Sequence, residues 1–226
     1  MPGKLKLALS SCLGLITSAA ILFVPAGSLR FWQAWVFLFL LFVPGISSFF
    51  YFYKHDPKLI ERRLQTKEKI SEQKRLVGLL RLLLVFAFFL PGVDYRFGWS
   101  RTHLRAVPLW LVLLSQVLVL GSVVFVLWVM KTNTFAASTI QVEARQTVIS
   151  TGPYSVVRHP MYLGGIVMFL ATPLALGSYV SLPVFGLVIP FYIFRLLNEE
   201  KVLLRDLVGY PEYCSRTRSR VIPFVW

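Results

Sequence analysis

Six long apolar segments dominate the sequence and restrict what it can fold into. They lie at about residues 5–27, 31–53, 76–92, 108–130, 161–177 and 179–197. Crossing the ~30 Å hydrocarbon core of a bilayer takes ~20 helical residues, and most of these segments reach or approach that length. Backbone polar groups inside lipid must pair within their own segment, so these segments are predicted to be helices.

The predicted fold is an all-α, polytopic membrane helix bundle with five to six transmembrane segments. The chain is 56% hydrophobic and 15% charged, whereas soluble domains are about half apolar and about a quarter charged. The last two segments are separated only by the turn at 177–178 and contain Pro173, Pro183 and Pro190. Since proline bends or breaks helices, we expect these two segments to form a kinked helical hairpin.

The first segment and the cysteines bear on processing and metal binding. Lys4 and Lys6 precede the first segment as they would in a signal peptide, but no clear small-residue cleavage site follows. We therefore expect an uncleaved transmembrane helix. Cys12 and Cys214 lie near opposite ends of the chain, without metal-ligand spacing. Neither a disulfide framework nor a metal site is predicted.

The chain is strongly basic, with 24 Lys and Arg residues, 10 Asp and Glu residues and a formal net charge of +14. In a membrane chain such an excess indicates basic cytoplasmic loops and anionic lipid headgroups rather than nucleic acid. With six crossings, most basic residues fall on one side. We therefore predict a multi-pass protein of the lipid bilayer with both termini, the 54–75 loop and the Arg158 loop in the cytoplasm.

The basic 54–75 loop is predicted to contain a surface helix. Asp56 is a suitable helix cap, and Pro57 suits the first helical position, where a missing N–H costs nothing. Arg62 and Arg63 belong to a charged run, and such runs are usually solvated. We expect this helix to lie at the membrane interface.

The C-terminal part of the chain is more polar. A long polar stretch covers residues 131–157, and long ordered loops in compact chains are usually functional. From Arg195 the pattern indicates an amphipathic cytoplasmic C-terminal helix that stops near Val208, because Gly209 and Pro211 follow.

Two charged clusters stand at the ends of the last apolar segments. Arg158 and His159 directly precede the fifth segment, between Tyr154 and Tyr162. Glu199 and Glu200 stand where the sixth segment leaves the bilayer. Ionisable groups at such positions usually face a protein interior or a water-filled cavity. Two alternatives stay open: Arg195 and Glu199 have the i, i+4 spacing of a helical ion pair, and the tyrosines suit interfacial anchoring.

These clusters resemble the integral membrane methyltransferases of the isoprenylcysteine carboxyl methyltransferase and phospholipid methyltransferase superfamily. The matching motifs are Thr151-Gly152-Pro153-Tyr154, Arg158-His159-Pro160-Met161-Tyr162-Leu163-Gly164, Glu199-Glu200, Gly209-Tyr210-Pro211-Glu212-Tyr213 and Arg220-Val221-Ile222-Pro223. They cover roughly the last two-fifths of the chain. The resemblance implies a cofactor-binding and catalytic region at 131–226, after N-terminal transmembrane helices at 1–130 with a basic cytoplasmic loop at 54–75.

The resemblance also implies S-adenosylmethionine as the cofactor and a lipophilic small-molecule or lipidated substrate, such as an isoprenylcysteine-type carboxylate or a phospholipid amine. The expected cofactor-binding residues are Gly152, Tyr154, Arg158, His159, Tyr162, Leu163, Glu199, Glu200 and Tyr213. Glu199 and Arg205 are the expected catalytic residues.

The side-chain chemistry agrees with this assignment. Arg158 and His159 could bind the carboxylate of the cofactor, since Arg offers a planar fork of donors. The two glutamates suit its ammonium or ribose hydroxyls, and the tyrosine rings could approach the adenine or the sulfonium. The site would then lie at the cytoplasmic face.

Two other functions stay open. An NADPH-dependent sterol or enone reductase of a related membrane fold would look distantly similar in the C-terminal region. A small transporter would carry charges within several helices, and apart from Arg81 almost none are found. The chain has no G-x-G-x-x-G turn after a strand, which argues against a soluble dinucleotide-binding domain.

Overall fold

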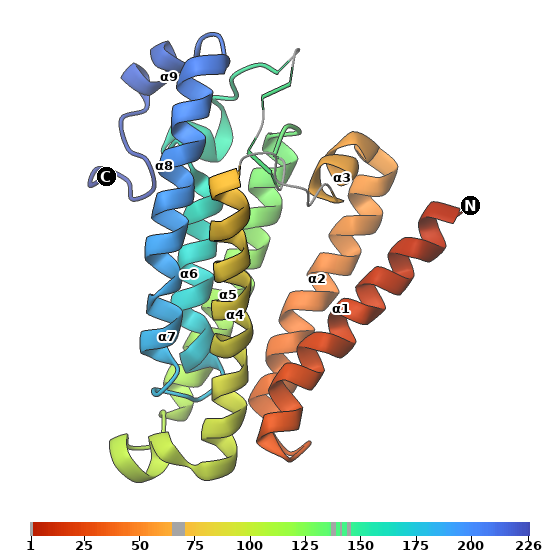
Figure 1. The fold of residues 1–226 in the computed structure, drawn as a ribbon, viewed down its shortest axis with the longest axis vertical. Helices are drawn as coiled ribbons and strands as arrows, with labels where there is room; N and C mark the ends of the chain where they lie inside the picture. The colour runs from red at the N-terminus through yellow and green to blue at the C-terminus, as the bar shows by residue number, and fades with distance from the viewer. Residues whose placement is uncertain (1, 65–70, 137–138, 141, 144–145) are drawn as a thin grey trace. The chain divides into compact units, whose positions relative to one another are not determined.

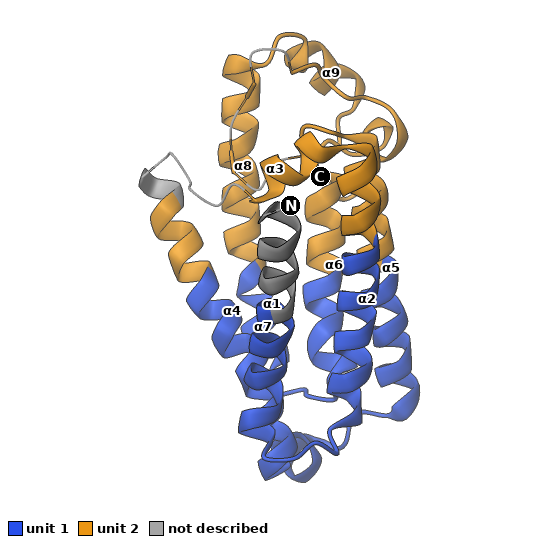
Figure 2. Ribbon diagram, turned by 90° about the vertical axis from the view of Figure 1, so that its right-hand side faces the viewer, with its two compact units in different colours: residues 1–47, 81–121, 168–188 blue, residues 48–80, 122–167, 189–226 orange. Residues whose placement is uncertain are grey.

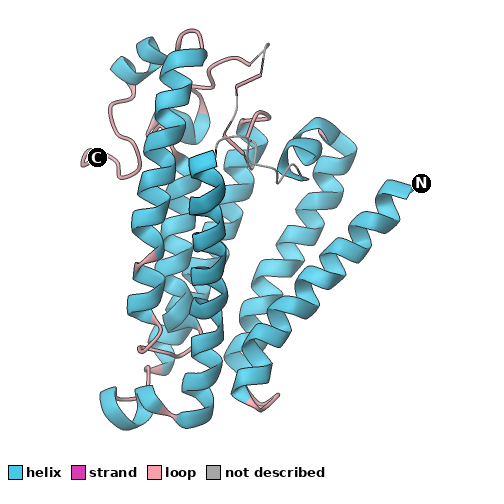
Figure 3. Ribbon diagram, in the orientation of Figure 1, coloured by secondary structure: helices cyan, strands magenta, loops and turns pink. Residues whose placement is uncertain are grey.

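The computed structural model of the protein describes residues 2–64, 71–136, 139–140, 142–143 and 146–226 (Figure 1). Within these ranges all regular secondary structure is helical and there is no strand (Figure 3). The α-helices are α1 (Pro2–Ala26), α2 (Trp32–His55), α3 (Pro57–Leu64), α4 (Ser71–Phe97), α5 (Leu109–Thr132), α6 (Pro160–Ala175), α7 (Leu182–Gly186), α8 (Val188–Asp206) and α9 (Tyr210–Arg216). A π-helical turn spans Ser100–Leu104, and a 3-10 turn spans Gly152–Ser155. The predicted all-α class is confirmed.

The six predicted apolar segments are all helical. In the described ranges, four stretches are long and apolar enough to cross a membrane: Trp32–His55, Lys74–Phe97, Leu109–Thr132 and Leu182–Asp206. Two shorter apolar helices are Leu13–Ala26 and Pro160–Ala175. These lengths agree with an integral, multi-pass membrane protein.

The turn predicted between the last two segments lies between α6 and α7. Gly177 has a φ of +73°, in the left-handed region that favours glycine. The Ser178 N–H donates to the Pro173 carbonyl over 2.8 Å, and the Ser178 and Ser181 hydroxyls are 2.7 Å apart. These bonds satisfy polar groups at a buried turn.

The amphipathic pattern that begins at Arg195 forms the second half of α8 rather than a separate helix. Residues 191–208 contain no Gly or Pro, so nothing interrupts the helical hydrogen bonds. The predicted stop is confirmed at Gly209, which has a φ of +83°. The short helix α9, with Pro211 in its first turn, was not predicted.

The chain divides into two compact units (Figure 2). Unit 1 comprises residues 1–47, 81–121 and 168–188, and unit 2 comprises residues 48–80, 122–167 and 189–226. The core of unit 1 is apolar and includes Leu22, Phe31, Phe37, Val119 and Ala175. In the same unit, Gly92 allows α1 and α4 to approach closely, because a Cβ atom there would lie 2.4 Å from the Leu22 carbonyl oxygen.

Unit 2 contains two apolar clusters. Leu59 and Ile60 of α3 are buried with Phe52 and Met130. The predicted cap of α3 is confirmed, since Asp56 Oδ1 accepts a 3.1 Å hydrogen bond from the Leu59 N–H. The second cluster contains Leu207, Tyr210 and Tyr213. Met161 packs against the first cluster and Tyr154 against the second.

Candidate active site

The loop that enters α6 is held by its own backbone and by the C-terminal segment. Gly152 begins the 3-10 turn with a φ of +58°, which favours glycine. The Arg158 N–H donates to the Ser219 carbonyl over 2.9 Å, and the His159 N–H donates to the Arg220 carbonyl over 2.8 Å. The segment after α9 therefore fixes the backbone of the Arg158-His159 pair.

Glu200 is the centre of a buried ion-pair network. Nη1 of Arg158 lies 2.8 Å from Oε1 of Glu200, and Nε of Arg220 lies 2.7 Å from Oε2. Nε2 of His159 is 3.7 Å from Oε1. The Glu200 side chain is only 5% exposed. Two guanidinium ions thus surround one carboxylate, and this excess of positive charge suits a second, bound anion.

Tyr162 of α6 contacts the neighbouring carboxylate, Glu199. Its hydroxyl donates to Oε2 of Glu199 over 2.6 Å. Its ring meets the rings of His159 and Tyr192 edge to face, with centroids 5.8 and 5.6 Å away. Adjacent positions of α8 therefore have different partners, a neutral hydroxyl for Glu199 and two cations for Glu200.

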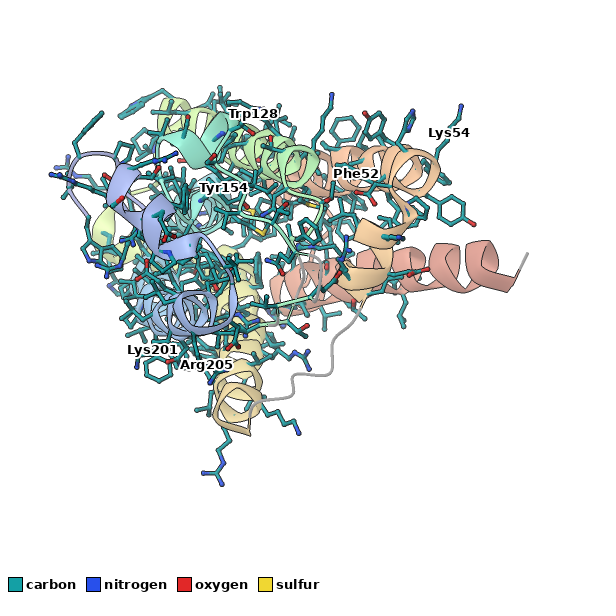
Figure 4. The ribbon with its side chains drawn as sticks, turned by 90° about the horizontal axis from the view of Figure 1, so that it is seen from above. Phe52, Lys54, Trp128, Tyr154, Lys201 and Arg205 are labelled. Carbon is teal, nitrogen blue, oxygen red and sulfur yellow. The ribbon has the colours of Figure 1, made fainter. Side chains whose placement is uncertain are left out.

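Tyr154 is held from two directions. Nδ2 of Asn133 donates to its hydroxyl over 2.9 Å, and the Tyr213 hydroxyl donates to its carbonyl oxygen over 2.7 Å. Burial raises the pKa of Tyr154 to about 12, so the phenol stays protonated at neutral pH. In Figure 4, Tyr154 lies among packed side chains, whereas Lys201 and Arg205 lie at the outer side of α8.

The two arginines of α3 are engaged with other parts of unit 2. Arg62 donates to both carboxylate oxygens of Glu143, over 2.6 and 2.7 Å, and to the Thr134 carbonyl over 2.7 Å. The hydrogen bond from Arg62 lowers the pKa of Glu143. Nη1 of Arg63 lies 3.5 Å from the sulfur of Met161, and burial lowers the pKa of Arg63.

The expectation that Arg62 is solvated is wrong, because its side chain is only 12% exposed. A charged run read along the sequence shows nothing of partners such as Glu143, which is 81 positions away. Part of the 54–75 loop, residues 65–70, lies outside the described residues.

Most of the predicted site residues are linked by contacts within unit 2: Tyr154, Arg158, His159, Tyr162, Glu199, Glu200 and Tyr213. Gly152 belongs to the loop before α6, and Leu163 lies in the first turn of α6. Arg205 is not brought into this network. Its side chain is 73% exposed and forms two hydrogen bonds with Asp206, of 2.6 and 2.8 Å.

Arg220 is a member of the network that sequence reasoning did not select as a site residue. A signal was present, since Arg220 opens the last motif of the family resemblance. That motif does not indicate that Arg220 pairs with Glu200. Among the described residues, no group of three or more His, Cys, Asp or Glu side chains could hold a metal ion.

Comparisons with known proteins bear on this region. Residues 110–207 match the family model described as phospholipid methyltransferase, over less than half of the chain. The Delta(14)-sterol reductase of Mus musculus is 36% identical over 88 residues, which cover 36% of this chain and 20% of the reductase. The chain thus spans about a fifth of the length of this curated relative.

A solved structure shares the fold. The eukaryotic intramembrane Ras methyltransferase ICMT (isoprenylcysteine carboxyl methyltransferase) superposes with a TM-score of 0.54 at 17% identity. The match covers 99% of this chain and 86% of that protein. Residues 110–207 thus resemble phospholipid methyltransferases in sequence, and the chain has the fold of the solved intramembrane methyltransferase.

Proposed function

We propose that the protein is an integral membrane, S-adenosylmethionine-dependent methyltransferase that acts on a lipophilic acceptor, such as an isoprenylcysteine-type carboxylate or a phospholipid amine. The observation that carries the proposal is the pairing of Glu200 with both Arg158 and Arg220 beside the Tyr162–Glu199 hydrogen bond. Four of these five side chains lie within residues 110–207, which match the family model; Arg220 lies after them. We assign the cofactor-binding and catalytic region to residues 131–226 and the N-terminal transmembrane helices to residues 1–130.

The charges of the network fit this cofactor. Arg158 and Arg220 carry two positive charges against the single charge of Glu200. The carboxylate of S-adenosylmethionine would balance the excess, with Arg158 and His159 as its contacts. Because Glu200 is already engaged by two guanidinium ions, we assign it the role of orienting them. Glu199 is then the carboxylate that contacts the ammonium or the ribose hydroxyls of the cofactor.

The residues of this site mainly position the reactants. S-adenosylmethionine supplies an electrophilic methyl group on a sulfonium when it is bound. Methyl transfer is an in-line displacement, so the protein must align the acceptor and exclude water. Tyr162 orients Glu199 through its 2.6 Å hydrogen bond, and Glu199 could take the proton of an amine acceptor. Arg205 is exposed, and its catalytic role stays a prediction.

We further propose that both termini and the site face the cytoplasm. The support is the distribution of basic residues, which gather in the loops assigned to that side. A cytoplasmic site would admit the cofactor from water and a lipophilic acceptor from the bilayer.

A second candidate function is reduction of a sterol or an enone with NADPH. The observation that favours it is the 36% identity to the Delta(14)-sterol reductase over 88 residues. The two candidates require different cofactors. Binding of S-adenosylmethionine and of NADPH to the purified full chain separates them, because each proposal predicts saturable binding of one cofactor and not of the other.

Methyl transfer itself is tested with membranes that contain the protein and S-adenosylmethionine labelled on its methyl group. We expect label in the lipid or lipidated fraction. The double variant Arg158→Ala, Glu200→Ala should abolish labelling, whereas Lys201→Ala, an exposed neighbour on α8, should leave it unchanged. Labelling that survives in the double variant would overturn the site assignment. No labelling by the parent protein, under conditions where it binds the cofactor, would show that the acceptor is not in the membrane.

A further inference from the structure

We propose that unit 1 contains a binding site for a primary ammonium group. A cavity of about 280 Å³ lies among the first residues of α2, the last turns of α4, the π-helical turn and the turn after α6. Its lining includes Gln33, Asp94, Tyr95, Ser100 and Arg101. All of these residues belong to unit 1, so this site and the proposed methyltransferase site in unit 2 can be tested separately.

Asp94 places a buried negative charge at this cavity. Asp94 is only 3% exposed. Its oxygens accept hydrogen bonds from the Ser100 N–H, over 2.7 Å, and from the Ser100 hydroxyl. Both donors are neutral, and no ion pair of Asp94 is found in the described part of the chain. A buried carboxylate without a counter-ion is costly, so a bound cation would stabilise it.

The position of the Asp94 carboxylate is fixed by its surroundings. The Ser100 hydroxyl oxygen also accepts the Tyr179 N–H over 2.9 Å. Ser100 therefore ties the end of α4 to the turn after α6 within unit 1. A carboxylate held in one geometry is suited to a ligand of defined shape rather than to diffuse counter-ions.

Gln33 adds an acceptor that determines the kind of cation. Its Oε1 atom is buried and has no hydrogen-bond partner among the described residues. Its backbone carbonyl is already bound by Nε2 of Gln116, over 3.1 Å. Leaving a buried carbonyl oxygen without a donor is costly, so a ligand that brings an N–H to this atom would be stabilised. A primary ammonium supplies three such donors, whereas a quaternary ammonium supplies none. The acceptors Asp94 and Gln33 therefore favour a primary ammonium.

The mouth of the cavity suits a lipid headgroup. Trp32 is the first residue of one candidate span, and Asp94 lies in the last turn of another, which ends at Phe97. Trp and Tyr are typical of the membrane–water interface. Arg101 is exposed and stacks over the Tyr95 ring at 5.5 Å, where its guanidinium could bind a phosphate. The same chemistry is presented by an ethanolamine phospholipid or by a free amine.

The test uses the purified full chain in detergent, with phospholipids of identical acyl chains and either ethanolamine or choline headgroups. Bound lipid is counted by native mass spectrometry. We expect the ethanolamine lipid to be retained about tenfold or more over the choline lipid, the discrimination expected for one hydrogen bond to a charged group. Free ethanolamine, added alone, distinguishes the sources: protection against thermal unfolding indicates recognition of the amine itself, and its absence indicates the lipid.

Two variants test the named acceptors. Asp94→Asn removes the charge at constant size, and Gln33→Met removes the unpartnered carbonyl; each should abolish the headgroup preference. The matched control is Glu212→Gln, an exposed acid in unit 2. Since Asp94→Asn could disturb folding, Gln33→Met provides an independent reading. Equal retention of both lipids by the parent, an unchanged preference in a folded Asp94→Asn or Gln33→Met variant, or the same thermal protection by sodium ions would overturn the proposal.

Discussion

Glu200 of α8 accepts a 2.7 Å hydrogen bond from Nε of Arg220, which lies 20 positions later in the chain. The bond joins α8 to the segment after α9, which in turn binds the backbone of Arg158 and His159. One carboxylate therefore organises both the cationic loop before α6 and the C-terminal segment. We therefore expect this network to contribute both to the free energy of unfolding and to cofactor binding.

Replacing Glu200 with Gln should lower both the free energy of unfolding and the affinity for the cofactor. The substitution leaves the buried guanidinium of Arg158 without its counter-ion, and removing one partner of a buried ion pair costs about 3 kcal/mol. We expect a loss of that size in the free energy of unfolding, measured by denaturant titration in mixed micelles, and weaker cofactor binding. Glu212→Gln, at an exposed acid, is the matched control and should change neither. Equal stability of Glu200→Gln and the parent would contradict the ion-pair account.

Replacing Tyr162 with Phe should reduce catalysis more than folding. The change removes only the hydroxyl that donates to Glu199 over 2.6 Å. A hydrogen bond to a charged group contributes about 1.5 kcal/mol, or roughly tenfold in kcat/KM. Helix content by circular dichroism should be unchanged. Tyr51→Phe, at a tyrosine that is 42% exposed, serves as the control. If both variants have the activity of the parent, Tyr162 does not position Glu199.

Replacing Gly152 with Ala should destabilise the loop before α6. At a φ of +58° an alanine costs roughly 1–2 kcal/mol, and its Cβ would lie 3.2 Å from Cγ2 of Thr132. Gly121→Ala is the control, because a Cβ there meets nothing within 4 Å and alanine favours a helix. We expect a lower thermal midpoint for Gly152→Ala alone. A midpoint at or above that of Gly121→Ala would show that the loop does not require this conformation.

The Arg62–Glu143 pair should make stability depend on pH at the acidic end. The hydrogen bond from Arg62 lowers the folded-state pKa of Glu143 below 4.5. A lowered pKa stabilises the fold above the unfolded-state pKa, and the stabilisation is lost as pH falls through the folded-state pKa. Glu143→Gln should therefore be less stable than the parent near neutral pH. The difference in thermal midpoint should shrink as the pH is lowered below ~4.5; a constant difference would contradict the ion-pair explanation.

Features that depend on local pattern could be predicted from the sequence. The length of the apolar segments indicated helices, and Asp56 was expected to cap α3, where it accepts the Leu59 N–H. Gly209 was expected to end a helix and has a positive φ. Each of these features is determined by residues within a few positions of one another.

Contacts between distant positions could not be predicted in the same way. The pairing of Arg62 with Glu143 and of Arg220 with Glu200 depends on packing that no local pattern describes. The sequence placed Glu200 where the sixth apolar segment leaves the bilayer, yet it did not indicate which cations would reach it. The amphipathic helix expected from Arg195 was part of α8, because periodicity alone does not show where one helix joins another.

The most direct test of the central claim is equilibrium binding of labelled S-adenosylmethionine to the purified full chain and to its Arg158→Ala, Glu200→Ala double variant. The account predicts saturable binding by the parent, no displacement by NADPH, and loss of binding in the double variant while Lys201→Ala binds as the parent does. Absence of binding by the parent, or equal binding by a folded double variant, would contradict it.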